Sequence, residues 1–164
     1  MARSKIKHFK GFSIVDGDIR VTLNMSRFER QFQRAQYQLD GAVMNSMVPF
    51  MPMVTGSFIN ATRAASAAVQ GSGEVYAAYG PQGRFLYEGK TMVDEKTGST
   101  WARKGAKKVL VSQYGGKTTA KEDLAYTKQA HPKAQSHWFD AAKKQEGKKW
   151  LRDAKMTAGG GQRG

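Results

Sequence analysis

The chain has 164 residues, of which 40% are hydrophobic and 24% charged, and this length and composition predict one soluble domain with short extensions. Its 27 Lys and Arg residues against 13 Asp and Glu residues give a formal net charge of +14, which favours attraction to polyanions. The absence of cysteine excludes disulfides, thiol nucleophiles and Cys-based zinc sites.

The most apolar stretch, residues 47–54, is broken by two prolines and is far shorter than the roughly twenty residues that a membrane span needs. The basic N-terminus is not followed by the apolar core of a signal peptide. We therefore expect no membrane partner and synthesis in the cytoplasm.

The positive charge is concentrated in the last third of the sequence. Counting Lys and Arg against Asp and Glu gives +3 for residues 1–24 (five against two), +1 for 25–100 (seven against six) and +10 for 101–164 (fifteen against five). The surface that faces a polyanion should therefore be C-terminal, although a merely solubilising surface is the alternative interpretation.

The first elements are predicted to be a hairpin and a long helix. Runs 12–15 and 18–24 flank the dipeptide Asp16-Gly17, which is a strong signal for a β-hairpin. A capping box, Ser26 to Glu29, then opens a pattern of apolar residues at spacings of three and four. This pattern predicts an amphipathic helix of about twenty-two residues, which ends at the proline segment 49–52.

Further elements follow the prolines. Thr55 is a plausible cap for a second, shorter helix that begins near Phe58. Residues 74–79 have the pattern of a short strand, and residues 80–83 that of a turn.

The C-terminal half is predicted to contain an arm, a helix and a tail. Residues 94–124 are polar and contain glycine, with one strand-like run at 109–114, which indicates an extended loop or hairpin arm. A helix with aromatic anchors and outward lysines follows Ser136. We expect one domain over residues 1–155 and a flexible tail over 156–164.

The sequence offers no convincing catalytic, nucleotide or metal constellation. The turn 71–74 lacks the further glycine of a dinucleotide site and the Gly-Lys-Ser/Thr of a phosphate loop. His131 and His137 are six residues apart with a proline between them, which does not fit a helical metal pair. Asp16 and Asp18 are explained by the hairpin turn. We therefore expect no enzyme activity and no cofactor.

The basic clusters are the candidate nucleic-acid contacts. In the C-terminal helix these clusters lie beside aromatic residues, which are expected to pack in the core. The alternative is that the aromatic residues form a stacking platform for single-stranded nucleic acid. The lysines would then meet a phosphate backbone without sequence preference. The candidate residues for contact with DNA are Lys107, Lys108, Lys143, Lys144, Lys148 and Lys149.

Four sequence segments carry a resemblance to a known family. They are MVPFMPMVTGSF (47–58), GEVYAAYGPQGRFLYEGK (73–90), HPKAQSHWFDAAK (131–143) and KKW (148–150). In this order they resemble the minor capsid or neck proteins of tailed bacteriophages and Gram-positive prophages, relatives of the head-to-tail joining family. The resemblance covers residues 19–155, and its one noted departure is Val54, where that family usually has an acidic residue before Thr-Gly.

The resemblance implies an α+β fold, in which a small antiparallel sheet is packed by a long amphipathic helix and accompanied by a C-terminal helix and an extended arm. It also implies a non-enzymatic structural subunit that forms a ring of six or twelve copies at the head-tail neck. The expected partners are connector or adaptor proteins, tail-terminator proteins and the double-stranded DNA in the channel. The expected location is the virion.

Two questions stay open at this stage. The apolar residues Phe50, Met51, Met53 and Phe58 are candidates for a contact between subunits, or equally for the core of the monomer. The rival function is a free, sequence-independent nucleic-acid-binding protein, which is motivated by the net charge of +14 and the lysine-rich C-terminus.

Overall fold

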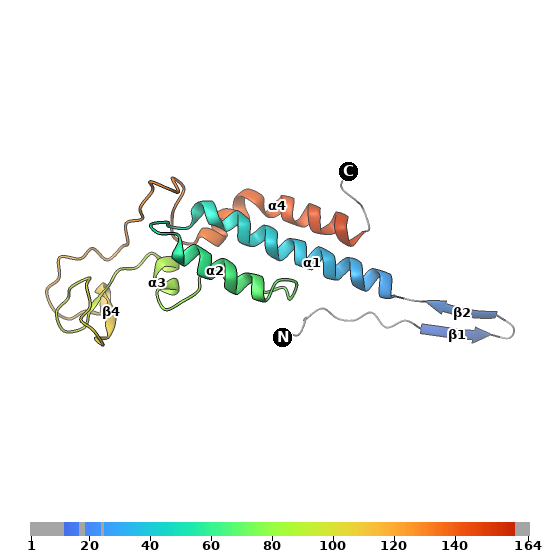
Figure 1. Ribbon diagram of the computed structural model, residues 1–164, viewed down its shortest axis with the longest axis horizontal. Coiled ribbons are helices and arrows are strands. Elements are labelled where there is room, and N and C mark those ends of the chain that lie inside the picture. The colour runs from blue at the N-terminus through green and yellow to red at the C-terminus, as the bar shows by residue number, and fades with distance from the viewer. Residues whose placement is uncertain (1–11, 17–18, 24, 160–164) are drawn as a thin grey trace. The chain divides into compact units, whose positions relative to one another are not determined.

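A computed structural model gives the structure of the chain, and it describes residues 12–16, 19–23 and 25–159. The fold is α+β, as expected, and consists of four α-helices, two short 3-10 helices and two separate two-stranded antiparallel sheets in this part of the chain (Figure 1). No helix in the same part is both long enough and apolar enough to cross a membrane.

The predicted hairpin is confirmed. Strand β1 (Phe12–Asp16) pairs with β2 (Ile19–Leu23) in antiparallel register, from Phe12 opposite Leu23 to Asp16 opposite Ile19. The residues that connect the two strands, 17 and 18, lie outside the described residues, and so does residue 24.

The long helix is also confirmed with the predicted bounds. Helix α1 (Ser26–Met47) begins at the capping box, and the N–H of Glu29 donates to the carbonyl of Met25 (3.1 Å). The helix gives way to the 3-10 helix η1 (Val48–Phe50), which has proline near its start. Proline at this point removes a backbone donor, and this explains why the regular helix ends at Met47.

Helix α2 (Ser57–Ala68) begins directly after Gly56, whose carbonyl accepts from the N–H of Asn60 (2.9 Å), so the cap position is Gly56 and not the predicted Thr55. The Thr55 hydroxyl accepts from the N–H of Ser57 (3.4 Å) in the turn before the helix. The predicted strand over 74–79 is wrong. In its place the chain runs without regular structure to helix α3 (Gly83–Glu88).

The physical reason is that side chains of α2 occupy the backbone groups that a strand would offer to a neighbour. The Ser66 hydroxyl accepts from the N–H of Tyr76 (3.1 Å) and donates to its carbonyl (3.3 Å). The Thr62 hydroxyl accepts from the N–H of Tyr79 (3.2 Å). With these groups satisfied, the segment needs no strand partner.

Residues 94–124 are folded onto neighbouring segments. Strand β3 (Met92–Asp94) pairs with β4 (Lys108–Leu110), and the strand-like run predicted for 109–114 continues as the 3-10 helix η2 (Val111–Gln113). At the far end the chain returns, because the N–H of Leu124 donates to the carbonyl of Gly89 (2.8 Å).

The last element is α4 (Trp138–Ala158), the predicted C-terminal helix. Residues 156–158, which were expected to belong to a flexible tail, are part of this helix. Residues 160–164 lie outside the described residues.

Although one domain was expected, the chain divides into two compact units. Unit 1 consists of Met1–Ser46, Arg63–Tyr76 and Ala142–Gly164, and unit 2 of Met47–Thr62 and Ala77–Ala141. In unit 1, α1 is joined to α4 by hydrogen bonds from Trp150 Nε1 to Ser46 Oγ (3.1 Å) and from Thr157 Oγ1 to Gln38 Oε1 (2.7 Å) (Figure 1). Helix α1 is thus bonded to the C-terminal helix.

Candidate functional site

Residues from three of the four segments that carry the resemblance meet in unit 2, around Trp138. This side chain is fully buried, and its Nε1 donates to the carbonyl of Ala77 (2.7 Å). Tyr87 and Phe58 pack edge-on against the indole, with ring centroids 4.9 and 5.9 Å away. Such edge-to-face pairs are favourable beyond the area they bury. Segments 47–58, 73–90 and 131–143 therefore contribute to one core.

The structure corrects part of the prediction that apolar residues of the proline segment form a contact between subunits. Phe50 and Met51 are buried within the chain, so they are not exposed on the monomer. Met53 and Phe58 are half-buried, and Phe58 contacts Trp138. The segment before α4 covers this region, since Lys133 Nζ lies 5.6 Å from the centroid of the Phe50 ring and the N–H of Gln135 donates to the carbonyl of Phe50 (3.0 Å).

The two histidines of this region serve the backbone. His131 Nδ1 is 2.8 Å from the carbonyl of Met51, and the carbonyl of His137 accepts from the N–H groups of Asp140 (3.0 Å) and Ala141 (3.2 Å) in the first turn of α4. His137 Nε2 also lies 3.4 Å from a carboxylate oxygen of Glu88. Within the described residues, no group of three or more metal-ligating side chains of the His, Cys, Asp or Glu type comes together.

The lysines proposed to contact DNA fall in both units. Lys143, Lys144, Lys148 and Lys149 lie in unit 1, on α4, and all four are exposed. Lys107 and Lys108 lie in unit 2, where Lys108 Nζ donates to the carbonyl of Thr100 (2.8 Å). That bond gives Lys108 a role within its own loop.

The lysines of α4 do not share one face of the helix. At 3.6 residues per turn, Lys144 and Lys148 are about 40° apart around the axis, whereas Lys143 lies roughly 100° to one side of Lys144 and Lys149 roughly 100° beyond Lys148. Lys149 Nζ is also 3.9 Å from Glu146 Oε2.

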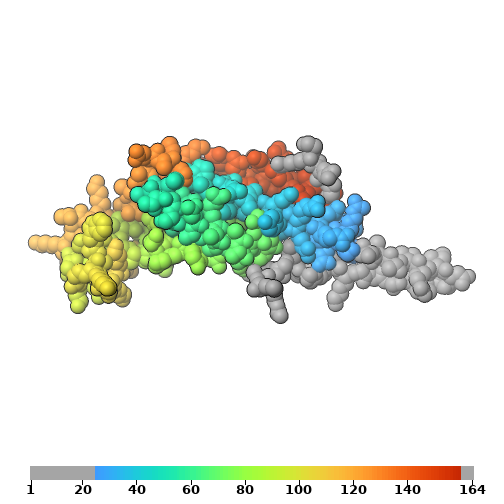
Figure 2. Space-filling view, viewed as in Figure 1, coloured from blue at the N-terminus to red at the C-terminus, as the bar shows by residue number. Residues whose placement is uncertain are grey.

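Two cations that the sequence prediction missed complete the face of Lys144 and Lys148. Arg152 and Lys155 are exposed and fall within about 80° of Lys144 around the axis. We call Lys144, Lys148, Arg152 and Lys155 the cationic stripe. The spacing of four, four and three residues places these side chains on one side of a helix. The sequence prediction named pairs of adjacent lysines and did not include this spacing. Figure 2 shows part of α4, in red, on the surface of the face drawn.

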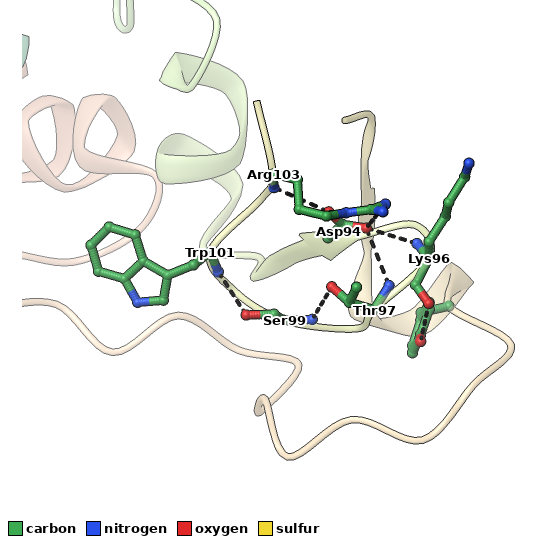
Figure 3. Close-up of polar contacts among 7 residues, drawn as sticks. Asp94, Lys96, Thr97, Ser99, Trp101 and Arg103 are labelled. Carbon is green, nitrogen blue, oxygen red and sulfur yellow. Dashed lines mark hydrogen bonds and ion pairs between the residues drawn. The ribbon is translucent and has the colours of Figure 1, made fainter. Parts of the chain in front are cut away.

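A second feature without a sequence prediction is the loop that follows β3 in unit 2. Asp94 is fully buried, and its carboxylate accepts from the N–H groups of Lys96 (2.8 Å) and Thr97 (3.2 Å) and from the backbone and guanidinium of Arg103 (3.0 to 3.2 Å) (Figure 3). The Arg103 guanidinium, followed by these backbone donors, holds the pKa of Asp94 well below its usual range. The loop is therefore closed by an ionised carboxylate.

Comparisons of the chain with protein-family models, with curated proteins and with solved structures gave no match.

Proposed function

We propose that the chain is a non-enzymatic structural subunit of a tailed-phage virion. It forms a ring in the head-tail neck, joins the portal side of the capsid to the tail, and surrounds the channel that carries double-stranded DNA. Its partners in this role are further copies of itself, connector or adaptor proteins and tail-terminator proteins. Before assembly the chain resides in the host cytoplasm.

The observation that carries this proposal is the core around Trp138. The resemblance to neck proteins rests on segments that are distant in the sequence, and Phe58 and Tyr87 from two of them both pack against Trp138 from a third. A catalytic site gathers polar and titratable side chains in an accessible cleft. These segments instead place two half-buried rings against the buried Trp138, which supports a role in holding a scaffold.

The cationic stripe supports the part of the proposal that concerns DNA. Each of its four side chains is exposed on α4. Arg152 Nε lies 3.7 Å from Asp153 Oδ1, so part of its charge is balanced within the helix, whereas Lys144, Lys148 and Lys155 lie on a different side of the helix from Glu146 and Asp153. Such a surface attracts a phosphate backbone without reading bases. This chemistry suits a channel through which DNA of any sequence passes.

The stripe also favours the second candidate function, a free nucleic-acid-binding protein. The two functions differ in where the protein resides and in whether neighbours are needed. A free binding protein holds DNA as a monomer, whereas a neck subunit is fixed at one place in the particle.

Electron microscopy of particles from a lysate of the phage or prophage that encodes the chain tests the proposal. Particles are labelled with gold through an antibody to the chain, and an antibody to the major capsid protein serves as the control. We expect label at the head-tail junction. Tailed particles without label, together with the chain bound to DNA in the soluble fraction, would contradict the neck function and support the second candidate.

A further inference from the structure

The loop closed by Asp94 displays a tryptophan. Trp101 is 87% exposed, although tryptophan is an amphipathic residue that usually buries most of its surface. Its N–H donates to Ser99 Oγ (3.1 Å), and two residues later Arg103 is tied to the buried Asp94. The indole points away from this polar cluster (Figure 3). The backbone on both sides of the indole is thus anchored, and the side chain is held in solvent.

The same unit contains a cavity of about 580 Å³ beside this loop. Thr100, the residue before Trp101, lines it, but Trp101 does not. The other lining residues are mostly apolar and include Phe85, Leu86, Met92, Ala106 and Leu124. A cavity of this size and lining accepts a large aromatic group.

Charges beside the cavity and beside Trp101 are complementary. Lys90 lines the cavity and is paired with Glu122 (3.5 Å) and Asp123 (2.8 Å), whose side chains are 56% and 84% exposed. Near Trp101, Arg103 is held by Asp94 of its own loop, but Lys104 is exposed. A second copy that brings its Trp101 to the cavity also brings Lys104 toward two exposed carboxylates.

We propose that the cavity of one copy binds the Trp101 side chain of a second copy of this chain. Repeated head to tail, such a contact closes a ring or extends a filament. The inference does not rest on the proposed neck function, because it concerns the association of the purified chain in solution. In a neck ring it would be the contact between neighbouring subunits.

A nucleic-acid base is the competing occupant for Trp101, since bases stack on exposed aromatic side chains. The structure favours a protein partner, because two nearby cations are committed to the loop itself. Arg103 holds Asp94, and Lys108 Nζ donates to the carbonyl of Thr100. A base on Trp101 would also leave the adjacent apolar cavity unexplained.

The test uses two variants of the full chain with complementary defects. Trp101→Ala removes the side chain that inserts but keeps the cavity. Gln82→Phe fills the cavity from its rim but keeps Trp101. Gln82 is exposed and its side chain makes no cap hydrogen bond to α3, so folding should be retained. Ala106→Phe is a second variant that fills the cavity. The control is Val54→Ala, which changes a residue of the same unit that is 82% exposed and does not line the cavity.

Sedimentation velocity over a range of protein concentrations measures the association. We expect the wild type and Val54→Ala to associate, and each of Trp101→Ala and Gln82→Phe to weaken association by at least about thirty-fold. An equimolar mixture of these two variants should form a heterodimer, because one intact tryptophan still meets one intact cavity.

Three results would overturn the proposal. One is a wild type that stays monomeric up to its highest soluble concentration. Another is association that Trp101→Ala leaves unchanged. The third is loss of single-stranded oligonucleotide binding in Trp101→Ala with association unaltered, which would assign the indole to nucleic acid. None of these results depends on where the chain lies in a phage particle, so failure here is distinguishable from failure of the neck function.

Discussion

Asp94 and Arg103 form an ion pair in unit 2 in which the backbone N–H of Arg103 also donates to the carboxylate. Arg103 Nε lies 3.0 Å from Asp94 Oδ2, with the carboxylate fully buried and the arginine side chain 54% exposed. The carboxylate of Asp94 is therefore shielded from water, whereas the Arg103 side chain remains about half exposed to it. The buried carboxylate is satisfied by N–H groups from both ends of its own loop, so the pair fixes the course of the chain between them.

Replacing Asp94 should open this loop. In Asp94→Asn, the amide cannot accept from all the donors that now face the carboxylate, and the Arg103 guanidinium loses its counter-charge. We expect a clear fall in the melting temperature, measured by circular dichroism. Glu95→Gln, an exposed neighbour of the same chemistry, is the matched control and should melt like the wild type.

The same pair predicts how stability depends on pH. Because the pKa of Asp94 is lowered in the folded state, its contribution is complete above the ordinary pKa of about 3.9 and is lost as the pH falls toward the lowered value. Between pH 2 and 4, the free energy of unfolding should fall more steeply with decreasing pH in the wild type than in Asp94→Asn. The difference between the two slopes corresponds to the uptake of up to about one proton on unfolding. Equal slopes in urea titrations across this range would contradict the assignment.

Truncation of the two tryptophans of unit 2 should change the free energy of unfolding by very different amounts. Trp138→Ala removes a buried indole and should cost about 3 to 5 kcal/mol in the free energy of unfolding. Trp138→Phe keeps an aromatic ring but leaves the carbonyl of Ala77 without its donor, and should cost about 1 to 3 kcal/mol. Trp101→Ala, at an exposed position, should stay within about 0.5 kcal/mol of the wild type. Urea unfolding of the three variants measures these differences, and a Trp138→Ala variant as stable as Trp101→Ala would contradict the core assignment.

Elements set by local pattern were predictable, and features set by contacts distant in sequence were not. The capping box at Ser26 and the apolar spacing that follows it are contained within α1, so both its start and its end could be read from the sequence. The segment 74–79 has the composition of a strand, but the hydroxyl of Ser66 takes the backbone groups of Tyr76. No local pattern indicates that competition.

The candidate sites divide in the same way. The cationic stripe follows from helical spacing once α4 is known, so its full membership could have been predicted from the sequence. The pairing of Asp94 with Arg103 spans nine residues of irregular chain, in which Gly98 adopts a positive φ of 67°. Without a repeating spacing, neither the pair nor the display of Trp101 is predictable. The burial of Phe50 depends on the tertiary contacts of the proline turn, which the sequence left undecided.

In unit 1, Asp40 should be a principal determinant of the loop after α2. It is buried in α1, and its Oδ2 accepts from the N–H groups of Gly71 (2.7 Å) and Gly73 (3.1 Å). Asp40→Ala leaves both donors unpaired, at about 1 to 3 kcal/mol each when they stay buried. Asp40→Asn retains one acceptor oxygen and should cost clearly less. Hydrogen exchange at the two glycine amides measures the effect, and unchanged protection in Asp40→Ala would contradict it.

The cationic stripe predicts that position on α4, and not net charge alone, determines DNA binding. Lys144→Glu with Lys148→Glu reverses two charges within the stripe, and Lys143→Glu with Lys149→Glu makes the same change in charge on its two flanks. We expect the stripe variant to bind double-stranded DNA at least about tenfold more weakly than the flank variant, and to lower the salt slope by about 0.9 for each phosphate that it no longer neutralises. Fluorescence anisotropy with two unrelated duplexes measures both quantities, and the two duplexes should give the same ranking because phosphate contacts carry no sequence information. Circular dichroism confirms that both variants keep α4. Equal weakening in the two variants would mean that the DNA responds to total charge and that the stripe is not a binding face.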